Sequence, residues 1–285
     1  MHKSFPEAEL ERLLGANVRF EERVESGGYG RVNAHWRVEL DDGRSVFVKQ
    51  ALTDEAEDWL RTERLVYEHV HGSFMPRLFG ASEALLALED LSGADWPPPW
   101  APARIDAVLA ALEELHSTEP PQGLPRLEDR RDDVVGWPSV RDDPEPLLST
   151  GVCSREWLMR ALPALLDAGA EAQLDGTELL HFDVRSDNLC FRDGTAVLVD
   201  WNIACVGNGR FDIAFWLPSL RLEDGPEPWE VLPDAGPLAA AVAGFFAARA
   251  GLPPPEGAPM VREFQLRQLG VALPWAAREL GQASP

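Results

Sequence analysis

The chain has 285 residues, 45% of them hydrophobic, and its 48 acidic against 26 basic side chains give a formal net charge of −22. This length can bury a sizeable core and suits one large or two small domains. Binding to nucleic acid is disfavoured, because few Lys and Arg side chains are present to displace counterions from phosphates, whereas an acidic surface favours solubility or contact with a cationic small molecule.

Residues 18–48 contain short apolar or alternating segments, VRFEERV, VNAHWRVEL and SVFVK, separated by turn-forming residues. This pattern predicts successive antiparallel strands. The first turn is rich in glycine, and its Ser26, Gly27, Gly28 and Gly30 would let backbone N–H groups approach a phosphate closely. Asn33 stands where a G-x-G-x-x-G loop has its third glycine, and an ordinary glycine-rich hairpin turn is the alternative interpretation.

A helix is predicted to follow, with Asp54 and Glu57 forming a start that resembles a capping box. One face of this helix is apolar, yet Glu63 lies in the middle of that face. A buried carboxylate is costly unless a cation pairs with it. Lys49, which ends the preceding strand, is the expected partner, as in kinase folds, where such a lysine contacts the α- and β-phosphates of a nucleotide. An ordinary ion pair between strand and helix is the alternative. The apolar face comprises Ala56, Trp59, Leu60, Val66, Tyr67 and Val70.

The segment ALLALEDL ends near residues 92–93, where the composition changes abruptly to ADWPPPWAPA. We interpret this change as a hinge between a small mixed lobe, residues 1–92, and a larger helical lobe, residues 93–285. In a kinase arrangement the backbone around Glu89 and Leu91 would hydrogen-bond the edge of a nucleotide base.

The second lobe is predicted to be mostly helical, because apolar residues recur at helical spacing through much of it. The segment between its first two helices is rich in Pro, Asp and Arg and predicts an irregular surface excursion that could include short helical turns. The expected helices span residues 104–116, 154–168, 237–250 and 259–281, and the excursion spans residues 118–146.

Two acidic features of this lobe have more than one interpretation. Asp212 precedes the apolar run IAFWL, so it could cap a helix or hydrogen-bond the loop around Asp183, which is called the catalytic loop. The acidic stretch over residues 223–230 could meet a cationic substrate, although a charged, solvated loop is the favoured interpretation.

The cysteines and the apolar segments give no sign of secretion or of a membrane span. Cys153, Cys190 and Cys205 form neither an even disulfide set nor a C-x-x-C zinc pattern. The N-terminal MHKSFPEAEL has acidic residues where a signal peptide needs an apolar core, and the apolar run over residues 238–250 is too short to cross a bilayer. We therefore expect reduced thiols and a cytoplasmic protein.

The most informative segment is HFDVRSDNLCFRDGTAVLVD, residues 181–200. Two short apolar runs flank a glycine-containing turn, which predicts a tight β-hairpin. Because a hairpin returns its ends to one place, Asn188 and Asp200 would lie side by side as oxygen ligands for Mg²⁺, with Asp183 placed to accept a proton from an attacking hydroxyl. The alternative is a solvated hairpin in which Asp and Asn serve as turn residues.

The order of these motifs resembles the aminoglycoside phosphotransferase and choline kinase-like family, whose members are small-molecule relatives of protein kinases. The resemblance implies an α+β, bilobal protein kinase-like fold, with a small antiparallel-sheet lobe that carries one main helix and a larger, mostly helical lobe. It also implies that Asp183 is the catalytic base, Asn188 and Asp200 are Mg²⁺ ligands, and Lys49, held by Glu63, is the phosphate-binding lysine.

The sequence departs from protein kinases in ways that favour a small-molecule acceptor. Asp200, Trp201 and Asn202 stand where protein kinases have D-F-G, and neither A-P-E nor an activation loop follows. Arg185, two residues after the expected base, could clamp the transferring phosphoryl group as a catalytic residue or could pair with Asp187.

We therefore expect a Mg²⁺-dependent phosphotransferase that uses ATP or GTP to phosphorylate a hydroxyl of a polar or cationic small molecule. An antibiotic of the aminoglycoside, basic peptide, macrolide or nucleoside type is the expected acceptor, as in resistance or self-protection. A metabolic kinase for choline, a sugar, homoserine or a similar alcohol is one alternative, and a nucleotide-binding pseudokinase that acts through partners is another. Neither nucleic acid nor a membrane is an expected partner, and the sequence leaves the oligomeric state open.

Overall fold

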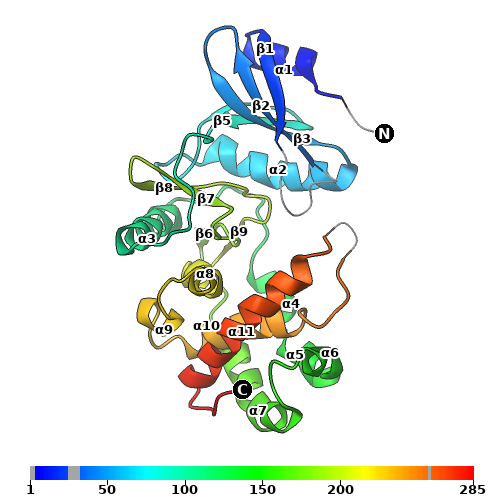
Figure 1. Cartoon of the computed structure of the whole chain (residues 1–285), viewed down its shortest axis with the longest axis vertical. Helices are drawn as coiled ribbons and strands as arrows, with labels where there is room; N and C mark the ends of the chain where they lie inside the picture. Colours follow the sequence, from blue (N-terminus) through cyan, green and yellow to red (C-terminus); the bar gives the residue numbers. More distant parts are fainter. Residues whose placement is uncertain (1–3, 25–32, 256–257) are drawn as a thin grey trace.

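A computed structural model of the chain describes residues 4–24, 33–255 and 258–285. It shows a small lobe, built from a sheet and helices, above a larger and mostly helical lobe (Figure 1). This arrangement confirms the predicted α+β architecture, while the division at residue 92 stays a prediction.

The small lobe contains a five-stranded antiparallel sheet in the order β1-β2-β3-β5-β4. The three strands predicted over residues 18–48 are present as β1, β2 and β3. The elements are α1 (Glu7–Leu14), β1 (Val18–Val24), β2 (Asn33–Leu40), β3 (Ser45–Ala51), α2 (Asp54–His69), β4 (Leu78–Ala81) and β5 (Leu85–Glu89).

The two faces of this sheet bury their side chains in two different clusters. Val46 and Val48 of β3 are fully buried in an apolar cluster that includes Leu10 and Leu14 of α1. Because side chains alternate along a strand, Lys49 points to the opposite face, toward α2. The alternation of β3 thus separates an apolar layer from the face that carries its lysine.

Helix α2 begins one residue earlier than the capping box predicted. Thr53, not Asp54, is the N-cap, and its Oγ1 accepts a hydrogen bond of 3.2 Å from the backbone N–H of Ala56. Both residue types cap helices well, so local sequence alone does not distinguish them. The apolar face is otherwise as predicted, with Glu63 buried in it at 2% exposure.

The larger lobe packs its helices around two short antiparallel strand pairs, β6 with β9 and β7 with β8. All four predicted helices are present, as α3, α7, α10 and α11. The elements are α3 (Pro102–His116), η1 (Glu128–Arg130), α4 (Arg131–Val135), α5 (Trp137–Asp142), α6 (Glu145–Ser149), α7 (Arg155–Glu171), β6 (Glu178–Leu180), β7 (Leu189–Arg192), β8 (Thr195–Leu198), β9 (Cys205–Gly207), α8 (Arg210–Leu222), α9 (Pro228–Val231), α10 (Gly236–Ala247) and α11 (Val261–Glu279).

The segment over residues 118–146 is not only a surface excursion, as its composition had suggested. Val134, Val135 and Trp137 are buried in the main core, and the Trp137 Nε1 donates a hydrogen bond of 2.7 Å to the carbonyl oxygen of Ala240 in α10. A few apolar residues among many polar ones therefore anchor this segment. Average composition conceals such isolated anchors.

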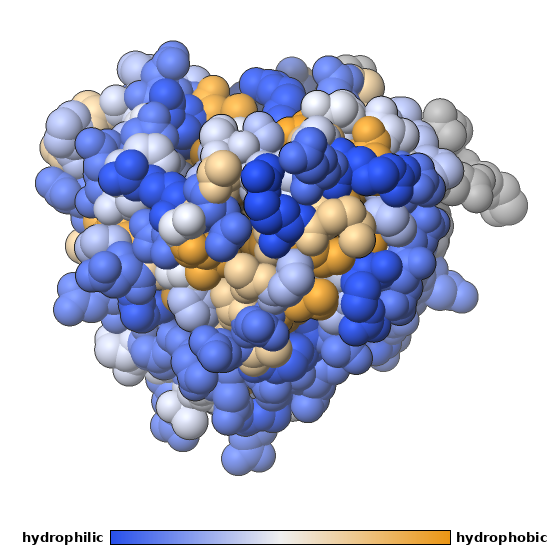
Figure 2. Space-filling view, turned by 90° about the horizontal axis from the view of Figure 1, so that it is seen from below, coloured by the Kyte–Doolittle hydropathy of each residue, from blue (hydrophilic) through white to orange (hydrophobic). Residues whose placement is uncertain are grey.

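The surface at the far end of the larger lobe is mostly hydrophilic, with one apolar area near its centre (Figure 2). Among the described residues, no helix combines the length and the apolar character needed to cross a membrane. The apolar run around α10 is a core helix, with Ala239, Ala241 and Val242 fully buried.

The close packing of α10 against the α4–α5 segment yields a stability prediction. A Cβ at Gly244 would overlap the carbonyl oxygen of Val135 and the Trp137 ring, whereas a Cβ at the exposed Gly270 of α11 would have no neighbour within 4 Å. We expect Gly244→Ala to lower the free energy of unfolding by about 1–3 kcal/mol through overpacking. Gly270→Ala is the matched control and should leave it unchanged or raise it by up to ~1 kcal/mol. Denaturant unfolding measures the free energy of unfolding of both variants. Equal values for the two variants would contradict the close contact of Gly244 with Val135 and Trp137.

Candidate active site

Three charged side chains meet between the sheet and the larger lobe. The Lys49 Nζ donates hydrogen bonds of 2.7 and 2.9 Å to the two carboxylate oxygens of Glu63, and a third of 3.0 Å to Oδ1 of Asp200. Lys49 and Glu63 are buried, while 38% of the Asp200 side chain is exposed. The structure thus brings together the lysine and glutamate that the sequence paired, and adds Asp200 to them.

The charge states in this cluster follow from mutual attraction. Burial alone would lower the pKa of Lys49, but Asp200 and Glu63 together raise it above its ordinary value. Burial would likewise raise the pKa of Asp200, but Lys49 holds that pKa below its ordinary value. The lysine is therefore a fixed cation, and Asp200 is a carboxylate with one side open to solvent.

The predicted hairpin places Asn188 next to Asp200. Strands β7 and β8 pair from Leu189 with Leu198 to Arg192 with Thr195, and beyond them the N–H of Val199 donates to the carbonyl oxygen of Asn188 at 2.9 Å. Asp193 and Gly194 make the turn with φ values of 50° and 82°, the left-handed pair typical of two-residue hairpin loops. The ends of the hairpin therefore meet, as expected.

Asp183 is oriented by the same asparagine. The Asn188 Nδ2 donates to the Asp183 carbonyl oxygen at 2.9 Å and to its Oδ2 at 2.8 Å. Burial raises the pKa of Asp183 to about 6, Asp200 adds to this rise, and Arg185 opposes it. A carboxylate whose pKa lies near neutrality is a better proton acceptor than an ordinary aspartate, which suits it to general base catalysis.

The oxygen atoms at this point fit a hard divalent cation. Because the Asn188 amide nitrogen is bound to Asp183, Oδ1 is the atom that this side chain can offer to a metal beside the Asp200 carboxylate. Within the described ranges no group of three or more His, Cys, Asp or Glu side chains forms a closed metal cage. Mg²⁺ commonly binds one or two carboxylates together with substrate phosphates and waters, so this sparse oxygen set is suited to it.

The structure shows which side chains Arg185 contacts, a question that the sequence left open. It lies 3.2 Å from Oδ1 of Asp183 and 3.1 Å from Oδ2 of Asp187, so it pairs with both carboxylates. Its guanidinium also lies over the Phe264 ring of α11, 5.5 Å from the centroid. Sequence reasoning missed Phe264, because nothing in the local pattern of α11 distinguishes it from other apolar residues.

Asp212 holds the backbone of the catalytic loop. This buried carboxylate accepts hydrogen bonds from the N–H groups of His181, at 2.9 Å, and Phe182, at 2.7 Å. Phe182 has a φ of 66°, a conformation that non-glycine residues adopt only at a cost. Of the two roles considered for Asp212, the structure therefore shows the contact with the catalytic loop.

The expected base-binding hinge and glycine-rich turn are only partly visible. The Glu89 carboxylate is bound to Arg192 at 2.6 and 2.7 Å, and the Glu89 backbone N–H donates to the carbonyl oxygen of Arg77 at 2.8 Å. Leu91 is buried with Cys190 and Val197. Base contact by Glu89 and Leu91 stays a prediction, and Ser26, Gly27, Gly28 and Gly30 lie outside the described residues.

The acidic stretch over residues 223–230 differs from the solvated loop that was expected. Glu223 accepts hydrogen bonds from Ser186 Oγ, at 2.5 Å, and from Trp100 Nε1, at 2.8 Å. Glu227 accepts one from Arg221 at 2.9 Å. These carboxylates have partners within the chain because the loop folds back toward α3 and the catalytic loop.

Comparison with known folds extends over nearly the whole chain. A thermostable mutant of aminoglycoside phosphotransferase APH(4)-Ia, in complex with ADP and hygromycin B, superposes with a TM-score of 0.60 at 17% identity, covering 98% of this chain and 97% of that one. A putative fructosamine-3-kinase from Thermobifida fusca gives 0.58 at 19% identity, covering 94% and 98%. An ethanolamine kinase from Plasmodium vivax gives 0.57 at 12% identity, covering 91% and 83%.

These likenesses show a protein kinase-like fold. No curated protein matches the sequence. The sequence model of the phosphotransferase enzyme family, in contrast, matches residues 26–269, which contain every motif described above. The chain therefore belongs to the phosphotransferase enzyme family and is a small-molecule phosphotransferase.

Proposed function

We propose that this protein is a Mg²⁺-dependent enzyme that transfers the γ-phosphate of ATP or GTP to a hydroxyl of a small molecule. One observation carries the proposal: Lys49, held by Glu63, contacts Asp200 at 3.0 Å, the end of the hairpin pairs Asn188 with the residue before Asp200, and Asn188 in turn binds Asp183. This arrangement would supply a phosphate-binding cation, two oxygen ligands for a metal and a base in one place.

Each side chain has a role that its contacts support. Lys49 would bind nucleotide phosphate oxygens, and Asn188 and Asp200 would hold Mg²⁺, which supplies neutralising charge to the phosphates. The acceptor oxygen forms a bond to the γ-phosphorus as the bond from that phosphorus to the bridging oxygen breaks, and the nucleoside diphosphate keeps the electron pair. Asp183 takes the proton of the acceptor hydroxyl on a carboxylate oxygen.

Arg185 would assist at the same point. Its guanidinium pairs with Asp183 at 3.2 Å, so it would lie near the transferring phosphoryl group and would stabilise negative charge that develops there. The Phe264 ring restricts the guanidinium to this region.

An antibiotic is the acceptor class we favour, with a polar or cationic molecule expected from the net charge of −22. The similar structure with hygromycin B supports this choice. The acidic stretch does not, because Glu223 and Glu227 have partners within the chain. A metabolic acceptor is the second candidate, favoured by the similarity to a fructosamine kinase and an ethanolamine kinase.

A nucleotide-consumption screen tests the proposal and separates these candidates. The protein is incubated with Mg²⁺ and either ATP or GTP against a panel of antibiotics and metabolic alcohols, and the phosphate is then located on the product. Turnover of an antibiotic, together with protection of cells that express the enzyme, supports the first class. Efficient turnover of a common metabolite without protection supports the second. Nucleotide binding without turnover of any compound would instead favour a pseudokinase.

Removal of the base should abolish transfer and spare nucleotide binding. We expect Asp183→Ala to reduce kcat by about 10²–10⁴-fold, because the acceptor proton loses its receiving group. Calorimetry with Mg-ADP should give an affinity close to that of the unchanged enzyme. Asp187→Asn removes the more exposed neighbouring carboxylate and is the matched control. Near-normal turnover by Asp183→Ala would overturn the assigned mechanism.

Removal of Asp200, the proposed metal ligand, should weaken the binding of Mg-nucleotide itself. Asp200→Ala should weaken the affinity for Mg-ADP about tenfold or more, because a carboxylate that contacts both Lys49 and the metal is lost. When EDTA removes Mg²⁺, the unchanged enzyme should bind ADP more weakly. The difference in ADP affinity between the unchanged enzyme and Asp200→Ala should then become smaller. Equal affinities in Mg²⁺ would argue against Asp200 as a ligand.

A further inference from the structure

The segment that follows β5 brings an indole to the backbone of the hinge. The Trp96 Nε1 donates a hydrogen bond of 3.2 Å to the carbonyl oxygen of Leu91. The same oxygen accepts a second hydrogen bond, of 3.0 Å, from the backbone N–H of Ala94. Because a carbonyl oxygen has two lone pairs, both acceptor positions of Leu91 are occupied within the chain.

The N–H of Leu91 differs from its carbonyl group. Over the ranges that the structure describes, this N–H has no hydrogen-bond acceptor, although Leu91 is buried. A buried donor without a partner is costly, so this group is suited to an acceptor atom of a ligand. At Leu91 the hinge therefore offers a donor and withholds an acceptor.

The backbone on both sides of Trp96 is anchored to the larger lobe. Asp95, the preceding residue, exchanges two backbone hydrogen bonds with Phe191 of β7, at 3.0 and 2.8 Å. Arg104 of α3 donates to the carbonyl oxygen of Pro99 at 3.1 Å. Although 40% of Trp96 is exposed, its main chain is held, so its indole N–H stays aimed at the hinge carbonyl.

The two candidate nucleotides present different edges to this backbone. Adenine has an acceptor at N1 and a donor at N6, whereas guanine has an acceptor at O6 and donors at N1 and N2. Adenine N1 can accept from the Leu91 N–H and requires nothing from the Leu91 carbonyl. Guanine, with O6 on that N–H, needs an acceptor beside it for its N1–H. The Leu91 oxygen no longer offers one, and a donor left unpaired on binding reduces affinity.

We propose that Trp96 is a specificity-determining residue that selects ATP over GTP by occupying the Leu91 carbonyl oxygen with its indole N–H. This inference rests on the proposed function, since it places the base of that reaction's nucleotide against Leu91. Trp96 acts against guanine without touching adenine, which is specificity by exclusion of the competitor. Because the selection depends on one side-chain donor, a single substitution should relax it.

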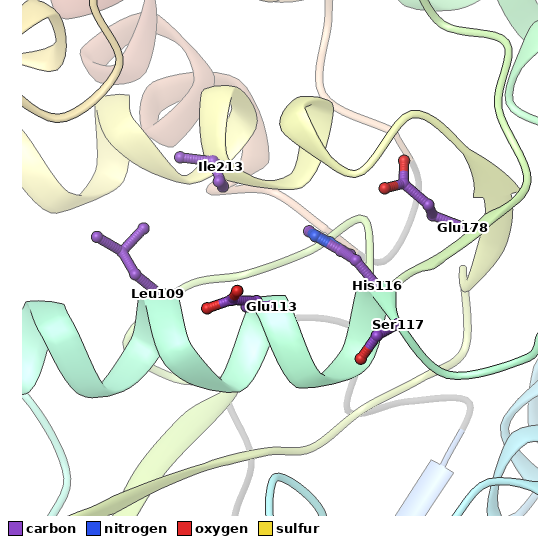
Figure 3. A pocket seen from close by; sticks show the side chains of 6 residues that line it. All are labelled: Leu109, Glu113, His116, Ser117, Glu178 and Ile213. Atoms are coloured by element: carbon purple, nitrogen blue, oxygen red, sulfur yellow. The ribbon is translucent and has the colours of Figure 1, made fainter.

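A cavity elsewhere in the larger lobe does not interfere with a measurement of nucleotide affinity. It has a volume of about 530 Å³, lies between α3, α8 and β6, and has Glu113, His116 and Glu178 among its lining residues (Figure 3). Its two carboxylates disfavour the phosphates of a nucleotide, because like charges repel. Neither Leu91 nor Trp96 lines this cavity. Binding of Mg-nucleotide should therefore report the hinge site.

Calorimetry with Mg-ADP and Mg-GDP tests the proposal without any acceptor. The unchanged protein should bind Mg-ADP more tightly than Mg-GDP by about tenfold or more. Trp96→Phe keeps an aromatic ring but loses the N–H, so one lone pair of Leu91 becomes available. The ratio of the two dissociation constants should then fall by on the order of fivefold, mainly through tighter binding of Mg-GDP. Trp229→Phe makes the same chemical change on α9, where the ring lies against Arg278, and should leave the ratio unchanged.

The possible results separate this inference from the proposed function. An unchanged ratio in Trp96→Phe would overturn the role of Trp96, and equal affinities or a preference for Mg-GDP in the unchanged protein would overturn the selection of ATP. If Trp96→Phe does not fold, Trp96→Leu, which also lacks the N–H, is judged by the same criterion. If the unchanged protein binds nucleotide but consumes none with any acceptor, phosphate transfer fails, while the affinity ratio still decides the role of Trp96.

Discussion

The site depends on one buried ammonium group shared by two carboxylates. Lys49 is bound to Glu63 of α2 and to Asp200 beyond β8, so a single cation joins the small lobe to the larger lobe at the proposed metal site. When both carboxylates are ionised, the trio retains one negative charge. That excess lies at Asp200, the member most open to solvent, which is where a divalent cation would be attracted. The same contacts keep Lys49 a cation, as the proposed phosphate-binding role requires.

The catalytic loop and Asp200, the proposed metal ligand, are held by strained backbone on the side of the larger lobe. Phe182 and Asp200 have φ values of 66° and 69°, and neither is glycine. Each such conformation costs about 1 kcal/mol or more and persists only where surrounding contacts impose it. Asp212 imposes it at Phe182, and the β7–β8 hairpin leads into it at Asp200. The positions of Asp183 and Asp200 are therefore set before any substrate binds.

Local sequence patterns predicted those parts of the site that depend on periodicity or turn chemistry. Alternation in β3 and the lone carboxylate on the apolar face of α2 were enough to pair Lys49 with Glu63, and the Asp193-Gly194 turn was enough to bring Asn188 to Asp200. The Thr53 cap was missed by one residue because Thr and Asp are both good caps. Such errors at element boundaries have little effect on the site.

Contacts between distant segments were beyond the reach of local patterns. His116 and Asp212 are 96 residues apart, and nothing in the local pattern of either segment pairs them. Phe264 read only as an apolar residue of α11, although its ring lies against Arg185. Trp137 was hidden in a polar segment, although it is wholly buried beside α10. In each case the partner is supplied by tertiary packing, which periodicity does not encode.

A double-mutant cycle on Mg-ATP affinity, measured by calorimetry, tests the central claim most directly. If Glu63 acts on the nucleotide only by holding Lys49, Glu63→Gln should weaken binding in the unchanged protein and have almost no further effect in a Lys49→Met background. Additive losses from the two substitutions would contradict the account, because Glu63 would then influence the nucleotide independently of the lysine.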